Sequence, residues 1–229
     1  MRKMTLDPNK QFFGDYVRAT VEIVLLRQYI RRMDGSLADA QDACATSVQA
    51  IPEASEMIAA AEVDLITCVD SEILNAGFVI SVAIFFEKQL REYSNALWQA
   101  ETLGLGLEDL SGSLPERFRK YCLHIAHLPE LMSETNWQDI RGFMEIRNCL
   151  VHKDGRLDGF GKADAVRTFV RRHGTPDIQD GILVVTTKTS HKCLDIVNKF
   201  IKSVYRVALA KYKPRRGGAS SNKADAGGA

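Results

Sequence analysis

The sequence has little that commits a chain to a membrane, to disulfide crosslinks or to a strongly charged partner. Its longest apolar run, residues 73–86, is interrupted by Asn75 and Ser81 and is shorter than the ~20 residues that cross a bilayer. The 30 lysines and arginines nearly balance the 29 acidic residues. The five cysteines form no CxxC pair, so we expect reduced thiols. We therefore expect a soluble cytoplasmic protein with no targeting segment and no membrane partner.

The sequence also lacks the common motifs of nucleotide and metal chemistry. It contains no Gly-rich phosphate loop, no Ser or Cys nucleophile motif and no pair of carboxylates at a diagnostic spacing. His124 and His127 are three residues apart, which would suit a metal ion only if carboxylates converged on them. We interpret both as partly exposed side chains, and we expect neither a metal ion nor an organic cofactor.

Charge is distributed unevenly along the chain. No lysine or arginine occurs between Arg32 and Lys88, where the sequence has ten acidic residues. Between Asp195 and Asp225 the sequence has eight basic residues and no acid. The acidic segment should repel polyanions and attract a basic partner, whereas the basic segment should attract polyanions. Alternatively, both segments are solvated faces of helices.

Helical periodicity dominates the first 150 residues. Asp34-Gly35 is predicted to end the first helix, because glycine tolerates the left-handed cap conformation. Pro52 breaks an alanine-rich stretch and suits the first turn of a new helix. Asp70 or Ser71 is predicted to cap the next, most apolar helix. The predicted helices cover residues 10–33, about 36–67 with the break near Pro52, about 71–99, 115–127 and 136–152.

The region after these helices is richer in glycine and charge, with one short helix predicted at 162–172. Asp180-Gly181 precedes the β-branched run ILVVTT, which is typical of a β-hairpin. Thr189 or Ser190 is predicted to cap the last helix. We therefore predict an all-α fold, an up-and-down helical bundle with a small loop and β-hairpin insertion before its last helix. The predicted parts are a single domain at 1–212, its insertion at about 153–187, and a disordered tail, first basic and then Gly- and Ala-rich, at 213–229.

Arg147 occupies an unusual place in the predicted helix 136–152. On a helical wheel with about 100° per residue, Arg147 falls in the middle of the apolar arc. Asn148 and His152 lie about 100° and 140° away, at one edge of that arc. An arginine that faces a core is costly unless its charge is compensated. The apolar residues of the arc are Trp137, Ile140, Phe143, Met144 and Val151.

Three kinds of partner could compensate the charge of Arg147. The first is a carboxylate of the same chain, for which Glu87 on the apolar central helix is the candidate. The second is a subunit interface at which two such helices meet. The third is an anionic ligand such as a phosphate, which the planar guanidinium group is suited to bind. The second and third can coexist.

The segment around Arg147 resembles a known family. Arg147-Asn148, three further residues and His152 are similar to the R-N-x3-H form of the Rx4-6H motif of HEPN domains (higher eukaryotes and prokaryotes nucleotide-binding). The context is similar too, because the motif ends a helix late in an all-helical domain and residues 80–93 resemble an earlier core helix. The other Arg–His pairs at permitted spacings lack asparagine after the arginine and are Arg117–His124, Arg119–His124 and Arg167–His173.

The resemblance implies a metal-independent endoribonuclease that acts as a homodimer, with the two motifs facing each other across a cleft. In such enzymes the ribose 2′-hydroxyl attacks the adjacent phosphate and leaves a 2′,3′-cyclic phosphate. Arg147 would hold the scissile phosphate, and His152 would accept or donate a proton. Asn148 would orient the imidazole, or would be a plain polar residue at a helix end. A toxin–antitoxin or phage-defence setting follows by analogy, with an antitoxin or other regulatory protein docking on the acidic segment.

Two other hypotheses remain open at the level of sequence. One is a catalytically inactive HEPN-like module that binds a nucleotide, an RNA or a protein. The other is an unrelated helical interaction protein in which Arg147 pairs with a core acid. In the ribonuclease hypothesis, residues of the central helix line the cleft and the basic tail binds the RNA backbone non-specifically. The RNA-binding residues expected outside the motif are Glu87, Arg91, Lys153, Lys211, Lys213, Arg215 and Arg216.

Overall fold

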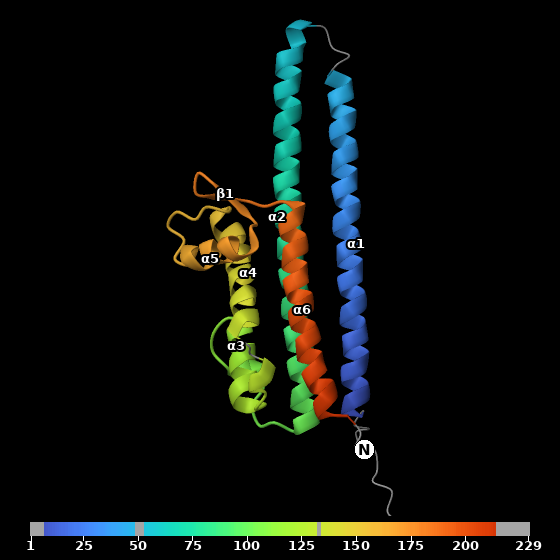
Figure 1. Ribbon diagram of the computed structural model, residues 1–229, viewed down its shortest axis with the longest axis vertical. Helices are drawn as coiled ribbons and strands as arrows, with labels where there is room; N and C mark the ends of the chain where they lie inside the picture. The colour runs from blue at the N-terminus through green and yellow to red at the C-terminus, as the bar shows by residue number, and fades with distance from the viewer. Residues whose placement is uncertain (1–6, 49–52, 132–133, 214–229) are drawn as a thin grey trace, which may run out of the picture.

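Two long antiparallel helices organise the molecule. A computed structural model describes residues 7–48, 53–131 and 134–213. Helices α1 and α2 form a hairpin whose far part projects beyond the other elements, and α6 lies along the near part of both (Figure 1). The described elements are α1 (Pro8–Val48), α2 (Glu53–Glu101), α3 (Leu114–Lys120), α4 (Glu134–Lys153), α5 (Ala163–His173), β1 (Asp177–Gln179), β2 (Ile182–Val184) and α6 (Thr187–Lys211). The predicted all-α helical bundle is confirmed.

The predicted helix ends at Asp34-Gly35 and at Asp70 or Ser71 are wrong, because α1 and α2 continue through both positions. An interior glycine costs only about 1 kcal/mol relative to alanine, and the alanine-rich sequence that follows sustains the helix. The carboxylate of Asp34 accepts a hydrogen bond from the Thr187 hydroxyl at 2.6 Å, so it is used between helices. The predicted break near Pro52 agrees with the ends of α1 and α2, while Pro52 itself lies outside the described residues.

The apolar part of α2 is shared between the core and the surface. By length and composition alone, Ser71–Glu101 is the one helical stretch in the described part of the chain that could cross a membrane. Half of its most apolar window is buried inside the structure. A core helix passes the same test, so length and hydropathy do not distinguish the two.

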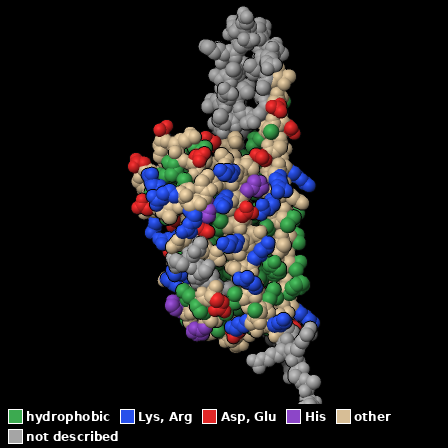
Figure 2. Space-filling model, viewed as in Figure 1, with side chains coloured by type: hydrophobic (Ala, Val, Ile, Leu, Met, Phe, Trp, Pro, Cys, Tyr) green, Lys and Arg blue, Asp and Glu red, His purple; other side chains and the backbone are tan. Residues whose placement is uncertain are grey.

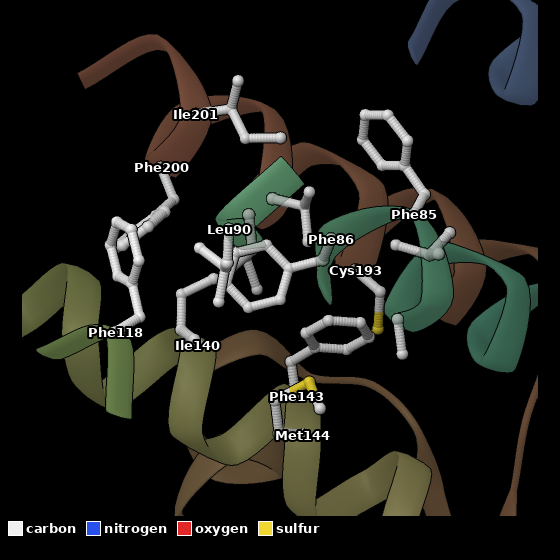
Figure 3. Close-up of a cluster of buried hydrophobic side chains, with 14 of the residues drawn as sticks. Phe85, Phe86, Leu90, Phe118, Ile140, Phe143, Met144, Cys193, Phe200 and Ile201 are labelled. Carbon is white, nitrogen blue, oxygen red and sulfur yellow. The ribbon is translucent and has the colours of Figure 1, made fainter. Parts of the chain in front are cut away.

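Phe86 of α2 lies at the centre of the core that holds α4 in place. Its ring meets Phe143 of α4 at 6.3 Å and Phe200 of α6 at 5.6 Å, both edge to face. Phe200 in turn meets Phe118 of α3 at 6.2 Å. Figure 3 shows these side chains converging from all four helices. Such aromatic pairs add to the burial of apolar area, so the inner face of α4 is fixed and only its outer edge can carry a site.

The predicted insertion packs against the end of α4. The predicted short helix and hairpin are both present, as α5 and the β1–β2 pair. The Leu183 amide donates to the Gly155 carbonyl at 2.9 Å, and the Leu157 amide donates to the Gly181 carbonyl at 2.8 Å. These backbone bonds tie the hairpin to the segment that follows α4.

Helix α6 begins before its predicted caps. Thr186 is the residue that precedes it, while Thr189 and Ser190 are buried within its first turn. The Thr189 hydroxyl accepts a hydrogen bond from the Thr186 amide at 3.2 Å and lies 2.6 Å from the Thr175 hydroxyl. The prediction was wrong by about one turn, because every threonine in this run can cap a helix.

The cysteines with described side chains are free thiols. Cys122, Cys149 and Cys193 are buried. Burial raises the pKa of the Cys193 thiol to about 12 and raises that of Cys122 further. Such thiols stay protonated and unreactive at neutral pH. The side chains of Cys44 and Cys68 lie outside the described part.

Gly142 of α4 packs directly against Phe169 of α5, so we expect its replacement by alanine to destabilise the protein. A Cβ atom added there would lie 2.7 Å from the Phe169 ring. Overpacking of this kind costs about 1–3 kcal/mol, measured as the free energy of unfolding in urea. Gly77→Ala is the matched control, because its added Cβ meets nothing within 4 Å. That variant should gain about 0.5–1 kcal/mol from helix propensity, and equal losses in both would refute the packing explanation.

Candidate functional site

A polar cavity of about 800 Å³ lies between α2, the α3 region and α4. Four residues predicted for the site line it together: Glu87 and Arg91 from α2, and Arg147 and Asn148 from α4. Basic side chains outnumber acidic ones by seven to three along its lining. The basic residues of the lining are Arg91, Arg117, Arg119, Lys120, Arg141, Arg147 and Lys162. An excess of cations in a concave site favours an anionic ligand.

The outer edge of α4 forms one wall of the cavity. Trp137 and Met144 of this helix are largely buried and line the cavity, while Ile140 and Phe143 are fully buried in the core. Arg147 is partly buried and also lines the cavity. The wheel predicts Arg147 in the middle of the apolar arc, and the structure shows that it is less buried than Ile140 and Phe143 of that arc.

Arg147 forms no ion pair with any described carboxylate. Its Nη1 donates a hydrogen bond to the Asn148 side-chain oxygen at 3.1 Å, and Asn148 Nδ2 donates to Glu145 Oε2 at 3.4 Å. The pairing with Glu87, considered from the sequence, is not formed, although both residues line the cavity. Two of the three predicted kinds of compensation therefore remain, an anionic ligand and a subunit interface.

Three arginines of the cavity have a buried Nε group without a hydrogen-bond partner. They are Arg117, Arg119 and Arg147. The fourth such side-chain atom in the described part is Nδ1 of His191, outside the cavity. A buried donor without an acceptor costs about 1–3 kcal/mol. All three arginines line the cavity, and guanidinium groups are suited to bind phosphate or a similar oxyanion.

The α3 arginines are held in position by other contacts. Arg117 Nη1 forms an ion pair with Glu108, and the guanidinium group of Arg119 lies 5.5 Å from the Trp137 ring centroid. Lys120 Nζ donates to the Ser111 carbonyl at 2.8 Å. These contacts fix the three basic side chains at the cavity without neutralising all of their charge, since among the described residues only Arg117 of the three is paired with a carboxylate.

Three acidic residues line the cavity, Glu87, Glu116 and Glu145, and the last two accept local hydrogen bonds. Glu116 accepts a hydrogen bond from the Ser113 amide at 3.1 Å, at the start of α3. That bond lowers the pKa of Glu116, and Lys120 and Arg141 lower it further. Glu116 therefore stays ionised as a helix cap. Glu87 forms no ion pair within the described residues, and it opposes binding of an anion through its own charge.

His152 lies outside the cavity. It is exposed, one turn beyond Asn148 on the same side of α4, and Lys153 ends the helix next to it. Val151, predicted to belong to the apolar arc, is 42% exposed. That part of the prediction was wrong, because the last turn of α4 runs past the core. The motif is therefore divided between the cavity, which holds Arg147 and Asn148, and the surface, which presents His152.

The basic residues predicted at the end of the chain are not brought to the cavity. Lys211 Nζ forms an ion pair with Glu101 Oε1 at 3.0 Å, at the end of α6 that lies farthest from the β1–β2 hairpin (Figure 1). The end of α4 that carries His152 lies beside the β1–β2 hairpin. Lys211 and Lys213 are therefore separated from His152 by the length of α6. Arg215 and Arg216 lie outside the described residues.

Several cavity residues were missed from the sequence. Arg141 falls at about 120° on the wheel that has Arg147 at zero, between Asn148 and His152, so the periodicity could have identified it. Arg117 and Arg119 were noted only as parts of other Arg–His pairs. Nothing in the local sequence indicates Lys162, because its position depends on how the insertion folds back over α4.

The remaining histidines give no sign of a metal site. His124 and His127 are exposed. His173 Nε2 lies 3.0 Å from Asp139 Oδ1, and Arg172 donates to the same oxygen at 2.7 Å. This cluster fastens α5 to α4. Within residues 7–48, 53–131 and 134–213, no group of three or more His, Cys, Asp or Glu side chains could hold a metal ion.

Known proteins give no guide to what the cavity binds. Comparison with models of protein families, with curated proteins and with solved structures gave no match. Function must therefore follow from the chemistry of the residues, and the resemblance of the R-N-x3-H motif stands on those residues alone.

Proposed function

We propose that the arginine cavity binds RNA through its phosphates and that the chain is a metal-independent endoribonuclease of the HEPN type. The observation that carries this proposal is the excess of basic over acidic side chains in the cavity, seven against three, with Arg117, Arg119 and Arg147 among them. They line one basic cavity and come from two different helices. A phosphodiester supplies two non-bridging oxygens, each of which can accept several hydrogen bonds from guanidinium groups.

In the proposed reaction, the ribose 2′-oxygen attacks the adjacent phosphorus and the 5′-oxygen of the next nucleotide leaves. His152 accepts the proton of the 2′-hydroxyl, and His152 of a second copy donates a proton to the leaving oxygen. The guanidinium group of Arg147 binds the non-bridging oxygens, where negative charge builds up. The 3.1 Å hydrogen bond that Arg147 Nη1 donates to Asn148 Oδ1 orients Arg147. The exposure of His152 leaves its imidazole accessible to RNA and to a second copy.

A second candidate function is a binding module without catalytic activity. The observation in its favour is that His152 is not among the residues that line the cavity. The module would use the same arginines for a nucleotide or an RNA, or would bind a partner protein. Both candidates fit a cytoplasmic protein of a toxin–antitoxin or defence system, in which an antitoxin or regulator binds the acidic segment between Arg32 and Lys88, on the hairpin of α1 and α2. The side chains of residues 53–70 in that hairpin lie outside the described part.

Removing two cavity charges tests the phosphate contacts directly. We expect Arg119→Gln combined with Arg141→Gln to weaken binding of a single-stranded RNA oligonucleotide by about tenfold or more near physiological salt. The slope of log affinity against log salt should also fall by about 1.4, because two phosphate contacts are lost. Fluorescence anisotropy over a range of salt concentrations measures both quantities.

The matched control removes two exposed charges outside the cavity, with Arg167→Gln combined with Arg171→Gln on α5. This control should keep the affinity and nearly the full slope. If both double variants lose the same slope, binding follows the total charge of the protein and the cavity has no special role. Melting temperatures of the two variants show whether either has lost its fold.

A further inference from the structure

The outer face of α1 is apolar and open to solvent over more than four turns. Its large apolar side chains are between 43% and 58% exposed. In Figure 2 they form the group of hydrophobic side chains along the right edge of the molecule, over α1. The residues of this α1 face are Phe13, Val17, Val21, Val24, Leu25 and Tyr29. On a wheel with Val21 at zero they all fall within about 80° of it, so they form one continuous surface.

The α1 face carries almost no charge. Among the exposed residues from 13 to 29, Arg18 alone is charged, and it is paired with Asp15 at 2.8 Å. The charged residues at the borders of the face are also paired, Glu22 with Lys88 at 2.7 Å and Arg27 with Asp195 at 2.5 Å. A solvated helix face is normally rich in unpaired charge. Burial of this apolar face in an interface is therefore favourable.

The size of the α1 face matches one half of a protein interface. It is about 24 Å long at 1.5 Å per residue. Its six side chains leave on the order of 500 Å² of apolar surface exposed, near the upper end for a monomer and comparable with the ~800 Å² that each partner contributes to a standard interface. The surface is convex and rigid, because it belongs to a single long helix.

We propose that the α1 face binds the same face of a second copy of this chain, with the two helices antiparallel around a twofold axis at Val21. This arrangement brings each Phe13 level with Tyr29 of the second copy and each Val17 level with Leu25. The face is therefore complementary to itself, as a twofold interface requires. A parallel pair would set the two Arg18 side chains next to each other, whereas the antiparallel pair places each one level with Val24.

This contact is distinct from the one in the proposed ribonuclease. In Figure 1, α1 and α4 lie on opposite sides of α2 and α6. A dimer formed through α1 therefore leaves both arginine cavities open on its outer sides. The proposed reaction uses His152 of a second copy, so it requires a separate contact near α4, which we propose forms only when RNA is bound. The α1 interface and the RNA site can thus be lost independently.

The test is the mass of the full-length, RNA-free protein in solution, by light scattering and sedimentation velocity. We expect a wild-type dimer at about 10 μM, and Val21→Lys should weaken dimerisation by at least tenfold because it places two charges on the axis. Leu105→Lys is the matched control, since Leu105 is a 49% exposed apolar residue in a loop away from α1, and it should remain dimeric. A monomeric wild type, or a dimer that Val21→Lys does not affect, overturns the proposal.

Crosslinking tests the antiparallel register. In the proposed dimer Val21 lies on the axis, so Val21→Cys should form a disulfide-linked dimer under mild oxidation, beyond the wild-type background. Gln28→Cys should not, because the two copies of residue 28 lie about 20 Å apart along the axis. Crosslinking of both variants would indicate a parallel pair and overturn the arrangement. RNA binding by Val21→Lys should match the wild type, so failure of this proposal and failure of the proposed function give different results.

Discussion

Replacement of His152 by alanine is expected to abolish RNA cleavage while leaving the fold intact. The imidazole is exposed at the end of α4 and makes no hydrogen bond within the described residues. A surface substitution of this kind changes the free energy of unfolding by no more than about 0.5 kcal/mol. Loss of a general acid or base slows a reaction by about 10²–10⁴-fold. Single-turnover cleavage of a labelled RNA, together with a thermal melt, measures both effects.

The matched control for this variant is His124→Ala. His124 is also exposed and also belongs to Arg–His pairs at a permitted spacing. In those pairs, however, the residue after the arginine is not asparagine. The His124→Ala variant should cleave RNA at the wild-type rate. Cleavage that survives in His152→Ala, or that is lost in both variants, would remove His152 from the mechanism.

Replacement of Arg147 by methionine is expected to weaken both RNA binding and cleavage without destabilising the protein. Methionine keeps the apolar stem of the side chain and removes the guanidinium group, whose Nε is buried without a partner. No described carboxylate is paired with Arg147, so none is left uncompensated. We expect a free energy of unfolding within about 1 kcal/mol of the wild type and a loss of cleavage of about 10²-fold or more.

The same variant separates two hypotheses about the motif. If Arg147 compensated a buried acid, its loss would cost about 3–5 kcal/mol, and urea unfolding would show it at once. That outcome would favour an interaction protein with a structural arginine. Arg147→Lys adds a second comparison: it keeps the charge and loses the planar fork, so it should restore part of the binding and less of the cleavage.

The site was predictable where it depends on the period of one helix. The wheel over residues 136–152 placed Arg147 in the middle of an apolar arc. The buried Ile140 and Phe143 confirm part of that arc, while Arg147 itself is only partly buried. The hairpin at Asp180-Gly181 was predictable for a similar reason, because two residues determine its turn. In both cases the information is local.

The rest could not be predicted, because it depends on contacts between distant segments. Asp34-Gly35 has the sequence of a helix end, but packing along α2 and α6 continues α1 through it. Lys162 and Arg117 reach the cavity only because the insertion and α3 fold against α4. The position of His152 outside the cavity depends on where α4 leaves the core. Helical periodicity predicts which face a residue is on, but not how far along the helix the core extends.

The most direct test of the proposed function is incubation of purified wild-type protein with mixed cellular RNA in EDTA, followed by analysis of the new RNA ends. We expect cleavage that leaves 2′,3′-cyclic phosphate and 5′-hydroxyl ends, because the attacking group is the ribose 2′-hydroxyl. RNA that is bound but uncut would contradict the ribonuclease and favour the binding module. Products with 5′-phosphate ends, or cleavage that requires a divalent metal ion, would contradict the chemistry proposed for Arg147 and His152.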